Sequence, residues 1–174
     1  IGLVNCAVGS TDMSEWVSGS CSNSNLAYCE LGDKCSQQVR QALAQHPGAY
    51  LAGILFNQGQ SDIHEGVGWW PSLFGQLVDT WHGSWGQVPI VFAQLGQFQD
   101  PLRTSQEIDF FRAAQSAIQK PNTAMIVTQD LPVIDGVHLT TEGQIQQGQR
   151  FAQVMAHTRP LKECTEPWWS RIVR

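Results

Sequence analysis

The sequence has little charge. Only 14% of its 174 residues are charged, whereas an average globular protein has about 25%. The formal net charge is −5 and no cluster of Lys and Arg interrupts it. Binding to nucleic acid needs a concentrated basic face, so we expect no nucleic-acid partner. Long apolar runs are also missing. No stretch approaches the roughly 18 residues of a membrane span, which predicts no membrane-spanning segment.

Closely spaced cysteine pairs of the zinc-binding type are absent, so we expect no metal ion. Cys6 lies in an apolar strand pattern, which predicts a small buried side chain. Cys21, Cys29 and Cys35 fall in a stretch rich in Ser, Asn and Gly, which suits a surface loop closed by a disulfide.

The first residues show no signal peptide, because Ile1–Val4 resembles the start of a strand rather than a basic segment before an apolar one. A mature exported protein fits this start together with at least one disulfide. We therefore expect a secreted or periplasmic location.

Apolar runs alternate with segments of helical periodicity, and 174 residues correspond to one domain. The runs predict four buried strands, at Ile1–Val8, Tyr50–Phe56, Val88–Leu95 and Thr123–Thr128. Helical spacing and capping residues predict helices at Asp33–His46, through Trp70–Trp81, from Thr104 to about Gln119, and from Thr141 onward. Strands that are apolar throughout and separated by helices indicate a three-layer α/β/α fold with a parallel sheet.

Ligands of such sheets bind beyond the carboxyl ends of the strands. The loops of interest therefore begin at Gly9, Asn57, Gly96 and Gln129.

The sharpest chemical motif is Asp135-Gly136-Val137-His138, just before the last predicted helix. An Asp three residues before a His can accept the Nδ1–H of the imidazole and leave Nε2 free as a general base. Taken alone, the motif is more typical of a turn Asp beside a surface His.

Two further loops carry polar groups suited to an oxyanion site. Residues 57–62 (Asn-Gln-Gly-Gln-Ser-Asp) follow a predicted strand and can direct amide donors into a cleft. Gly9-Ser10-Thr11 follows the first predicted strand, where glycine lets a backbone N–H approach a ligand closely. Each is also typical of an ordinary polar loop.

Several blocks together resemble the SGNH hydrolases, specifically the family 6 carbohydrate esterases (acetyl xylan esterases) and the sialate O-acetylesterases. They occur in the family's order as Ile1–Thr11 with Ser14–Trp16, Gln58–Asp62, Arg112–Gln115 and Asp135–Gln144. The resemblance covers residues 1–157, which implies an esterase domain there and a C-terminal tail at 158–174.

The resemblance implies roles for four residues. His138 corresponds to the catalytic base and Asp135 to the acid that orients it. Gly9, through its N–H, and Gln58, through its side chain, correspond to oxyanion-hole donors. The implied reaction is hydrolysis of an O-acetyl ester of a carbohydrate, or of a small acetyl ester, through an acyl-enzyme and without a cofactor.

The sequence departs from the family in its nucleophile. The family's catalytic Ser lies in a Gly-Gln-Ser-Asn block after the first strand of a flavodoxin-like sheet, and that block does not occur in these residues. The resemblance places this strand between Ile1–Val8 and Tyr50–Phe56. Smaller departures are Gln60, where the family has Glu, and Ser10, where it has Gly.

Three explanations remain open for the missing block. The chain can be a C-terminal piece of a longer esterase whose N-terminal segment carries the nucleophile, and by itself it would then be an inactive fragment. Alternatively, a serine of this chain can replace the missing one. Ser61 is one candidate because Gly59–Asp62 echoes the missing block, and Ser10 is another because it adjoins Gly9. The third explanation is a non-catalytic carbohydrate-binding relative, against which the retained Asp135–His138 pair argues.

Tryptophans are candidates for stacking on sugar rings. Trp70 and Trp81 match the apolar face of their helix, which predicts that they pack in the core. Trp69 and Trp85 lie outside that face and remain candidate substrate-binding residues.

Overall fold

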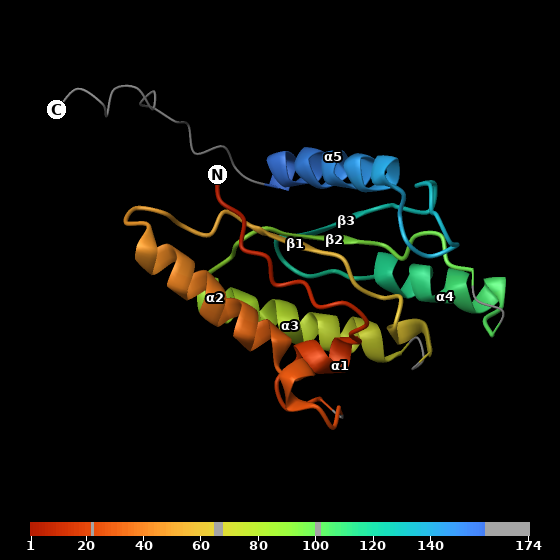
Figure 1. Cartoon of the computed structure of the whole chain (residues 1–174), viewed down its shortest axis with the longest axis horizontal. Helices are drawn as coiled ribbons and strands as arrows, with labels where there is room; N and C mark the ends of the chain where they lie inside the picture. The colour runs from red at the N-terminus through yellow and green to blue at the C-terminus, as the bar shows by residue number, and fades with distance from the viewer. Residues whose placement is uncertain (22, 65–67, 100–101, 159–174) are drawn as a thin grey trace.

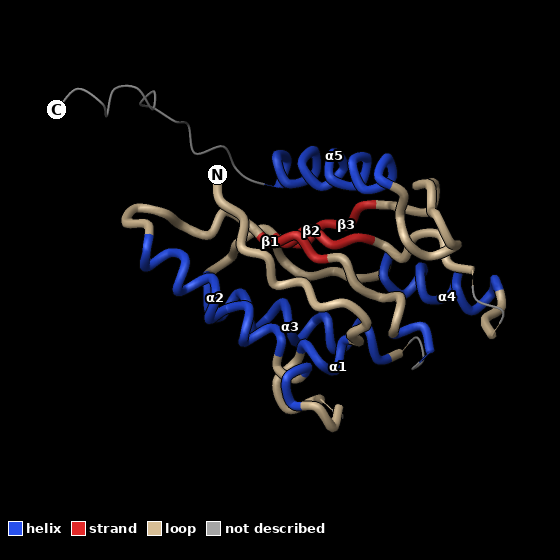
Figure 2. Tube along the Cα trace, in the orientation of Figure 1, coloured by secondary structure: helices blue, strands red, loops and turns tan. Residues whose placement is uncertain are grey.

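The computed structural model describes residues 1–21, 23–64, 68–99 and 102–158 (Figures 1 and 2). The helices are α1 (Met13–Trp16), α2 (Leu31–Gln45), α3 (Trp69–Trp85), α4 (Ser105–Ser116) and α5 (Thr141–Thr158). Two short 3-10 helices are η1 (Leu26–Tyr28) and η2 (Asp62–His64), and the strands are β1 (Ile54–Phe56), β2 (Ile90–Ala93) and β3 (Thr123–Ile126). No helix among these residues is both long and apolar enough to cross a membrane.

The three strands form a parallel sheet in the order β1-β2-β3. Helix α3 connects β1 to β2, and α4 connects β2 to β3. The middle strand β2 is buried along its whole length, as expected for a strand covered on both faces. The α/β class and the parallel sheet predicted from the sequence are confirmed.

Helices cover both faces of the sheet (Figure 1). Helix α5 lies on one face, where Phe151 packs with Val91, Ala93 and Ile126. The larger cluster on the other face contains side chains of α1, α2, α3 and α4. Alternate residues of β2 therefore serve two separate cores, which confirms the three layers.

Aromatic rings fill the larger core. Trp70 and Phe74 on α3 stack with centroids 4.8 Å apart, and Phe74 lies 4.8 Å from Phe92 of β2. Trp70 and Trp81 are 1% and 2% exposed, which confirms their predicted place in the core. The rings fix α3 against the sheet and so place the loops at its carboxyl end.

The predicted first strand is wrong. Residues 1–8 are mostly exposed and belong to no strand, and the side chain of Leu3 is 90% exposed. An apolar run favours extended structure, but a strand also needs a neighbour with which to exchange backbone hydrogen bonds. No strand among the described residues exchanges backbone hydrogen bonds with residues 1–8.

The cysteines depart from expectation in two respects, because Cys6 is bonded and Cys35 lies on α2 rather than in the expected surface loop. Cys6 is not a free buried side chain, because it forms a disulfide with Cys35 on α2. Cys21 and Cys29 form a second disulfide, so the prediction of at least one disulfide is confirmed. The bond from Cys6 fixes the N-terminal segment to α2, although no strand of the described residues pairs with that segment.

One predicted helix cap is present in the structure, and two helices begin differently from the prediction. The capping box of Thr104 and Glu107 at the start of α4 is present. The Thr140 hydroxyl, and not that of Thr141, accepts the Gly143 N–H at the start of α5. Helix α2 begins at Leu31 after an uncapped Glu30, two residues before the predicted Asp33. The expected C-terminal tail lies outside the described residues apart from its first residue.

Candidate active site

A hollow of about 400 Å³ lies where the loops after all three strands meet. It is lined by Asn57, Gln60, Gly96, Gln97, Thr128, Val137, His138, Leu139, Gln144 and Gln147. We call this hollow the carboxyl-end cavity. Its position matches the rule that parallel sheets bind ligands beyond the carboxyl ends of their strands.

The catalytic pair inferred from the sequence meets at the edge of this cavity. The Nδ1 atom of His138 lies 2.7 Å from Oδ2 of Asp135. The other carboxylate oxygen accepts the backbone N–H groups of Val137 at 3.1 Å and His138 at 2.8 Å. One carboxylate therefore fixes both the turn and the ring that the turn presents.

These contacts determine the charge of Asp135. The hydrogen bond from the His138 backbone, followed by the one from its side chain, lowers the Asp135 pKa from 3.8 to about 2. The carboxylate is thus ionised at neutral pH and accepts the Nδ1–H of His138. This arrangement leaves Nε2, the atom suited to general-base chemistry, without a partner in the Asp135 turn.

The Asp135 turn is anchored to its surroundings. The Ile134 N–H donates to the His138 carbonyl at 2.8 Å, and the Gln99 N–H donates to the Gly136 carbonyl at 3.0 Å. Gly136 has a φ of 86°, and a Cβ there would lie 2.9 Å from the Cβ of Gln99. The turn therefore requires glycine both for its backbone angle and for its close approach to Gln99.

The lining of the carboxyl-end cavity is rich in side-chain amides. Asn57 and Gln60 come from the loop after β1, Gln97 from the loop after β2, and Gln144 and Gln147 from the first turns of α5. None of the described lining residues is Lys, Arg, Asp or Glu. The cavity thus offers neutral donors and acceptors beside one histidine.

Gln58 is buried, and both its amide nitrogen and its amide oxygen form hydrogen bonds. Its Nε2 donates to the Thr11 carbonyl at 2.9 Å and to the Asp62 carboxylate, and its Oε1 accepts the Trp70 indole N–H at 2.6 Å. Both amide hydrogens have acceptors, so Gln58 can serve an oxyanion only by releasing one of them. In this structure it ties the N-terminal loop to α3.

Gly9, Ser10 and Ser61 are not among the residues that line the carboxyl-end cavity. Gly9 and Ser10 are exposed, and Ser10 has a φ of 59°. Ser61 is partly buried just before η2. The structure thus brings His138 and Asp135 together but places neither candidate serine in the cavity beside them.

The two candidate tryptophans lie at opposite ends of α3. Trp69 is its first residue and is 68% exposed. Trp85 is its last residue, about 24 Å away at 1.5 Å per residue. The Arg40 guanidinium lies 5.4 Å from the Trp85 ring centroid. Trp85 therefore packs on α2, away from the carboxyl ends of the strands.

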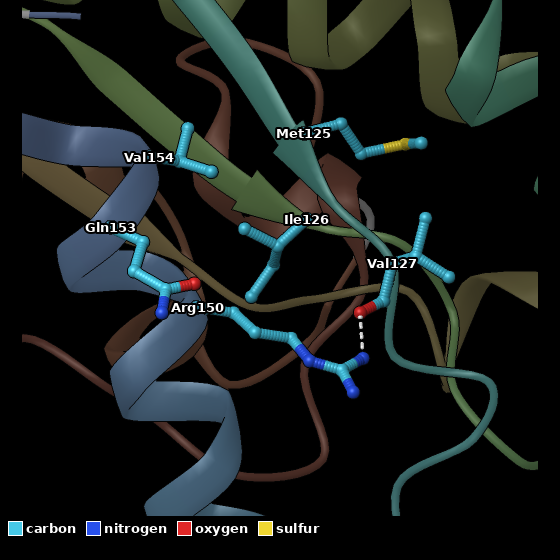
Figure 3. Close-up of a pocket in the computed structure, with 6 residues that line it drawn as sticks. All are labelled: Met125, Ile126, Val127, Arg150, Gln153 and Val154. Carbon is cyan, nitrogen blue, oxygen red and sulfur yellow. Dashed lines mark hydrogen bonds between the residues drawn. The ribbon is translucent and has the colours of Figure 1, made fainter. Parts of the chain in front are cut away.

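A second hollow, of about 260 Å³, lies between β3 and α5 (Figure 3). Arg150 there donates to the Val127 carbonyl at 2.7 Å and pairs with Asp130 at 2.6 Å. Its other lining side chains are mostly apolar, and none of its lining residues was predicted from the sequence to belong to a functional site.

The residues missed by the sequence analysis are mainly the amides. Asn57 and Gly96 were marked as the starts of loops, and both line the cavity. Gln144 and Gln147 were missed although they lie three residues apart on a helix that begins just after His138. That spacing on one helix face was the signal that could have identified them.

A family model described as "Carbohydrate esterase, sialic acid-specific acetylesterase" matches residues 1–157. The chain belongs to this carbohydrate esterase family. A probable carbohydrate esterase from Arabidopsis thaliana is 28% identical over 158 residues, which are 88% of this chain and 54% of the relative. The chain thus spans about half the length of the curated relative it matches.

Two solved structures share the fold of this chain. A protein from Arabidopsis thaliana superposes with a TM-score of 0.71 at 23% identity, over 87% of this chain and 59% of the other. A carbohydrate acetylesterase from Xanthomonas citri superposes with a TM-score of 0.57 at 18% identity, over 88% and 36%. At these identities the likeness supports the fold alone.

Proposed function

We propose that this protein is a serine esterase that removes O-acetyl groups from carbohydrates. The observation that carries the proposal is the Asp135–His138 pair, joined at 2.7 Å at the edge of the carboxyl-end cavity. A binding protein has no need of a histidine held in this manner, whereas acyl transfer requires a general base there.

In the proposed reaction a serine Oγ attacks the acetyl carbonyl carbon while its proton passes to Nε2 of His138. Asp135 stabilises the resulting imidazolium through the hydrogen bond to Nδ1. The sugar hydroxyl leaves with that proton, and an acetyl-serine remains. Water then attacks the acetyl group, again losing a proton to His138, and acetate and the free serine are released.

The nucleophile comes, in this proposal, from an extended N-terminal segment of the same protein that pairs with the open edge of β1. On that edge the described residues contribute no strand, and the Leu55 side chain is 53% exposed. Val8 packs against the core cluster that contains Phe56, and the Cys6–Cys35 disulfide fixes residues 1–8 to α2. A strand at this edge would pair with β1 and end at the carboxyl-end cavity.

The substrate proposed is a neutral acetylated sugar of the xylan type rather than a sialate. Five of the described lining residues are amides and none is Lys or Arg. A sialate would bring a carboxylate into a cavity whose described lining includes no Lys or Arg, whereas amides match sugar hydroxyls as both donors and acceptors. Comparison of acetylated xylo-oligosaccharide with O-acetyl sialic acid as substrates tests this preference.

The two disulfides support a secreted or periplasmic location, because such bonds persist mainly in oxidising compartments. Detection of both bonds by non-reducing peptide mapping of the native protein would agree with this location.

The test of the function is hydrolysis of 4-nitrophenyl acetate by the protein expressed from its complete gene. His138→Ala should lower kcat/KM by about three orders of magnitude or more. His157→Ala is the matched control, because His157 is exposed near the far end of α5 and should leave the rate unchanged. Undiminished activity of the His138 variant would contradict the proposal. Binding of xylo-oligosaccharide without any hydrolysis would instead support the carbohydrate-binding alternative.

A further inference from the structure

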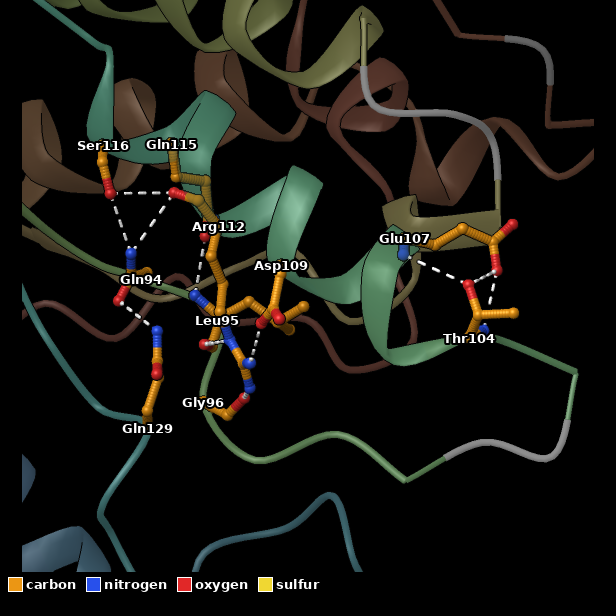
Figure 4. Close-up of polar contacts among 10 residues, drawn as sticks. All are labelled: Gln94, Leu95, Gly96, Thr104, Glu107, Asp109, Arg112, Gln115, Ser116 and Gln129. Atoms are coloured by element: carbon orange, nitrogen blue, oxygen red, sulfur yellow. Dashed lines mark hydrogen bonds and ion pairs between the residues drawn. The ribbon is translucent and has the colours of Figure 1, made fainter.

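Behind the carboxyl-end cavity, a buried glutamine of α4 contacts the end of β2 (Figure 4). Gln115 is 1% exposed, and its Oε1 accepts the Leu95 N–H at 2.7 Å. Leu95 directly precedes Gly96 and Gln97, which line the cavity. The position of Gln115 therefore sets the position of one cavity wall.

Arg112, one turn earlier on α4, contacts the same backbone. Its Nε donates to the Leu95 carbonyl at 3.0 Å, and its terminal nitrogen donates to the Gly96 carbonyl. Asp109 balances its charge at 3.0 Å. Two side chains thus hold three backbone groups at the end of β2, as Figure 4 shows for the arginine.

The other end of the Gln115 amide has no partner. Its Nε2 is the one buried side-chain nitrogen or oxygen without a hydrogen bond among the described residues. The orientation of the amide is fixed, because only its oxygen can accept the Leu95 N–H. A buried donor left unpaired is unfavourable, so a partner that forms in another state of the protein would relieve it.

Nε2 faces the loop after β1. A Cβ at Gly59 would lie 3.2 Å from Nε2 and 3.2 Å from the Phe111 ring. Gly59 also has a φ of 146°. The position therefore favours glycine both for its backbone angle and for its close approach to α4. The neighbouring Gln60 lines the carboxyl-end cavity. Gln115 therefore lies between two loops that both form the cavity.

We propose that Gln115 is a positioning residue of the esterase site that joins these two loops. Its Oε1 holds the Leu95–Gln97 loop, and its Nε2 donates to a backbone carbonyl of the Gln58–Gln60 loop when acetate or an acetyl ester occupies the cavity. Arg112 keeps the first loop in register. This inference rests on the proposed function for its kinetic consequence only.

The kinetic test compares Gln115→Glu with Gln106→Glu, its control on the exposed face of the same helix. The Gln115 variant keeps an acceptor for the Leu95 N–H but loses both amide hydrogens. We expect its kcat on 4-nitrophenyl acetate to fall by about 10- to 100-fold, with KM changed by less than about 3-fold, because misplaced loops raise the barrier more than they weaken binding. Wild-type kcat in the variant would overturn the inference.

A second pair of variants covers the case in which the buried carboxylate prevents folding, which circular dichroism would show. Arg112→Lys keeps the cation and can reach one carbonyl, whereas Arg112→Met reaches neither. We expect kcat to fall from Arg to Lys to Met at nearly constant KM. An equal loss in both variants, or a change confined to KM, would overturn the positioning role.

An NMR titration with acetate, the reaction product, tests the contact between loops without catalysis. In the wild-type protein the Gly59 and Leu95 amide signals should move together, and in Gln115→Glu only the Leu95 signal should respond. Equal movement of Gly59 in both proteins would overturn the inference. A wild-type protein inactive on every ester would refute the proposed function alone, and this titration would still decide the role of Gln115.

Discussion

Replacing Asp62 by Asn should remove a pH dependence of stability that this buried carboxyl imposes on the protein. Asp62 is 4% exposed. It accepts the Met13 N–H at 2.8 Å and a hydrogen bond from the Gln58 amide. Burial raises its pKa from 3.8 to about 6, although these hydrogen bonds act in the opposite direction.

The sign follows from which state binds the proton more tightly. The folded protein holds the Asp62 proton up to about pH 6, whereas the unfolded chain releases it near 3.8. The free energy of unfolding is therefore highest below pH 4 as far as this group is concerned, and it decreases as the pH rises through 6. The difference between these pKa values corresponds to about 3 kcal/mol.

The assay is urea denaturation of the wild type and Asp62→Asn at pH 4, 5, 6 and 7, followed by tryptophan fluorescence. The wild-type free energy of unfolding should fall by about 2 kcal/mol relative to the variant between pH 4 and pH 7, because the unfolded carboxyl is already more than half ionised at pH 4. Asp79→Asn, at a carboxylate 65% exposed beside Lys120, is the control and should parallel the wild type. The pKa values of Asp130 and Asp135 are lowered to about 2, so both groups remain ionised throughout. Parallel curves for the wild type and the Asp62 variant would refute the reasoning.

Replacing both Cys6 and Cys35 by Ser should lower the free energy of unfolding by about 2–4 kcal/mol, because the disulfide closes a long loop; an unchanged urea midpoint would contradict this. Thr104→Ala should cost about 1 kcal/mol by removing the cap of α4, and Thr104→Ser should restore most of it; equal stabilities of the two variants would count against the cap. Asp135→Asn should lower kcat by about 10²–10⁴-fold, because His138 loses the acceptor that fixes its tautomer; a kcat within 2-fold of the wild type would exclude that role.

The layered fold could be predicted because its middle strand β2 is buried on both faces, between α5 on one side and the larger core cluster on the other. Such strands appear as continuous apolar runs, and β2 and β3 lie inside the runs predicted at Val88–Leu95 and Thr123–Thr128. The predicted strand at Tyr50–Phe56 begins four residues too early. Composition locates a strand, but its ends depend on where the neighbouring strand supplies hydrogen bonds.

Residues 1–8 show the limit of this reasoning. Their apolar composition resembles that of β2, yet they form no strand among the described residues. Pairing is a property of the neighbouring chain and not of the run itself. The Cys6–Cys35 bond was hidden for the same reason, because nothing local indicates that a run at the N-terminus lies beside α2.

The candidate site likewise contains some contacts that the sequence could predict and others that it could not. The Asp135–His138 contact joins residues three positions apart, so the sequence could predict it. The engagement of Gln58 depends on Thr11, 47 positions away, and that of Gln115 on Leu95, 20 positions away. Contacts of this kind follow from the packing of helices on the sheet, and no local pattern of residues reveals them.

The measurement that tests the central claim most directly is labelling with a fluorophosphonate, which reacts with serines activated by a histidine. Labelled peptides from the protein expressed from its complete gene would be identified by mass spectrometry, beside His138→Ala as the control. We predict one labelled serine in a segment that precedes Ile1, and loss of the label in the variant. Labelling of Ser61 or Ser10 would contradict the proposed strand at β1. No labelled serine, or equal labelling in both proteins, would contradict the serine esterase itself.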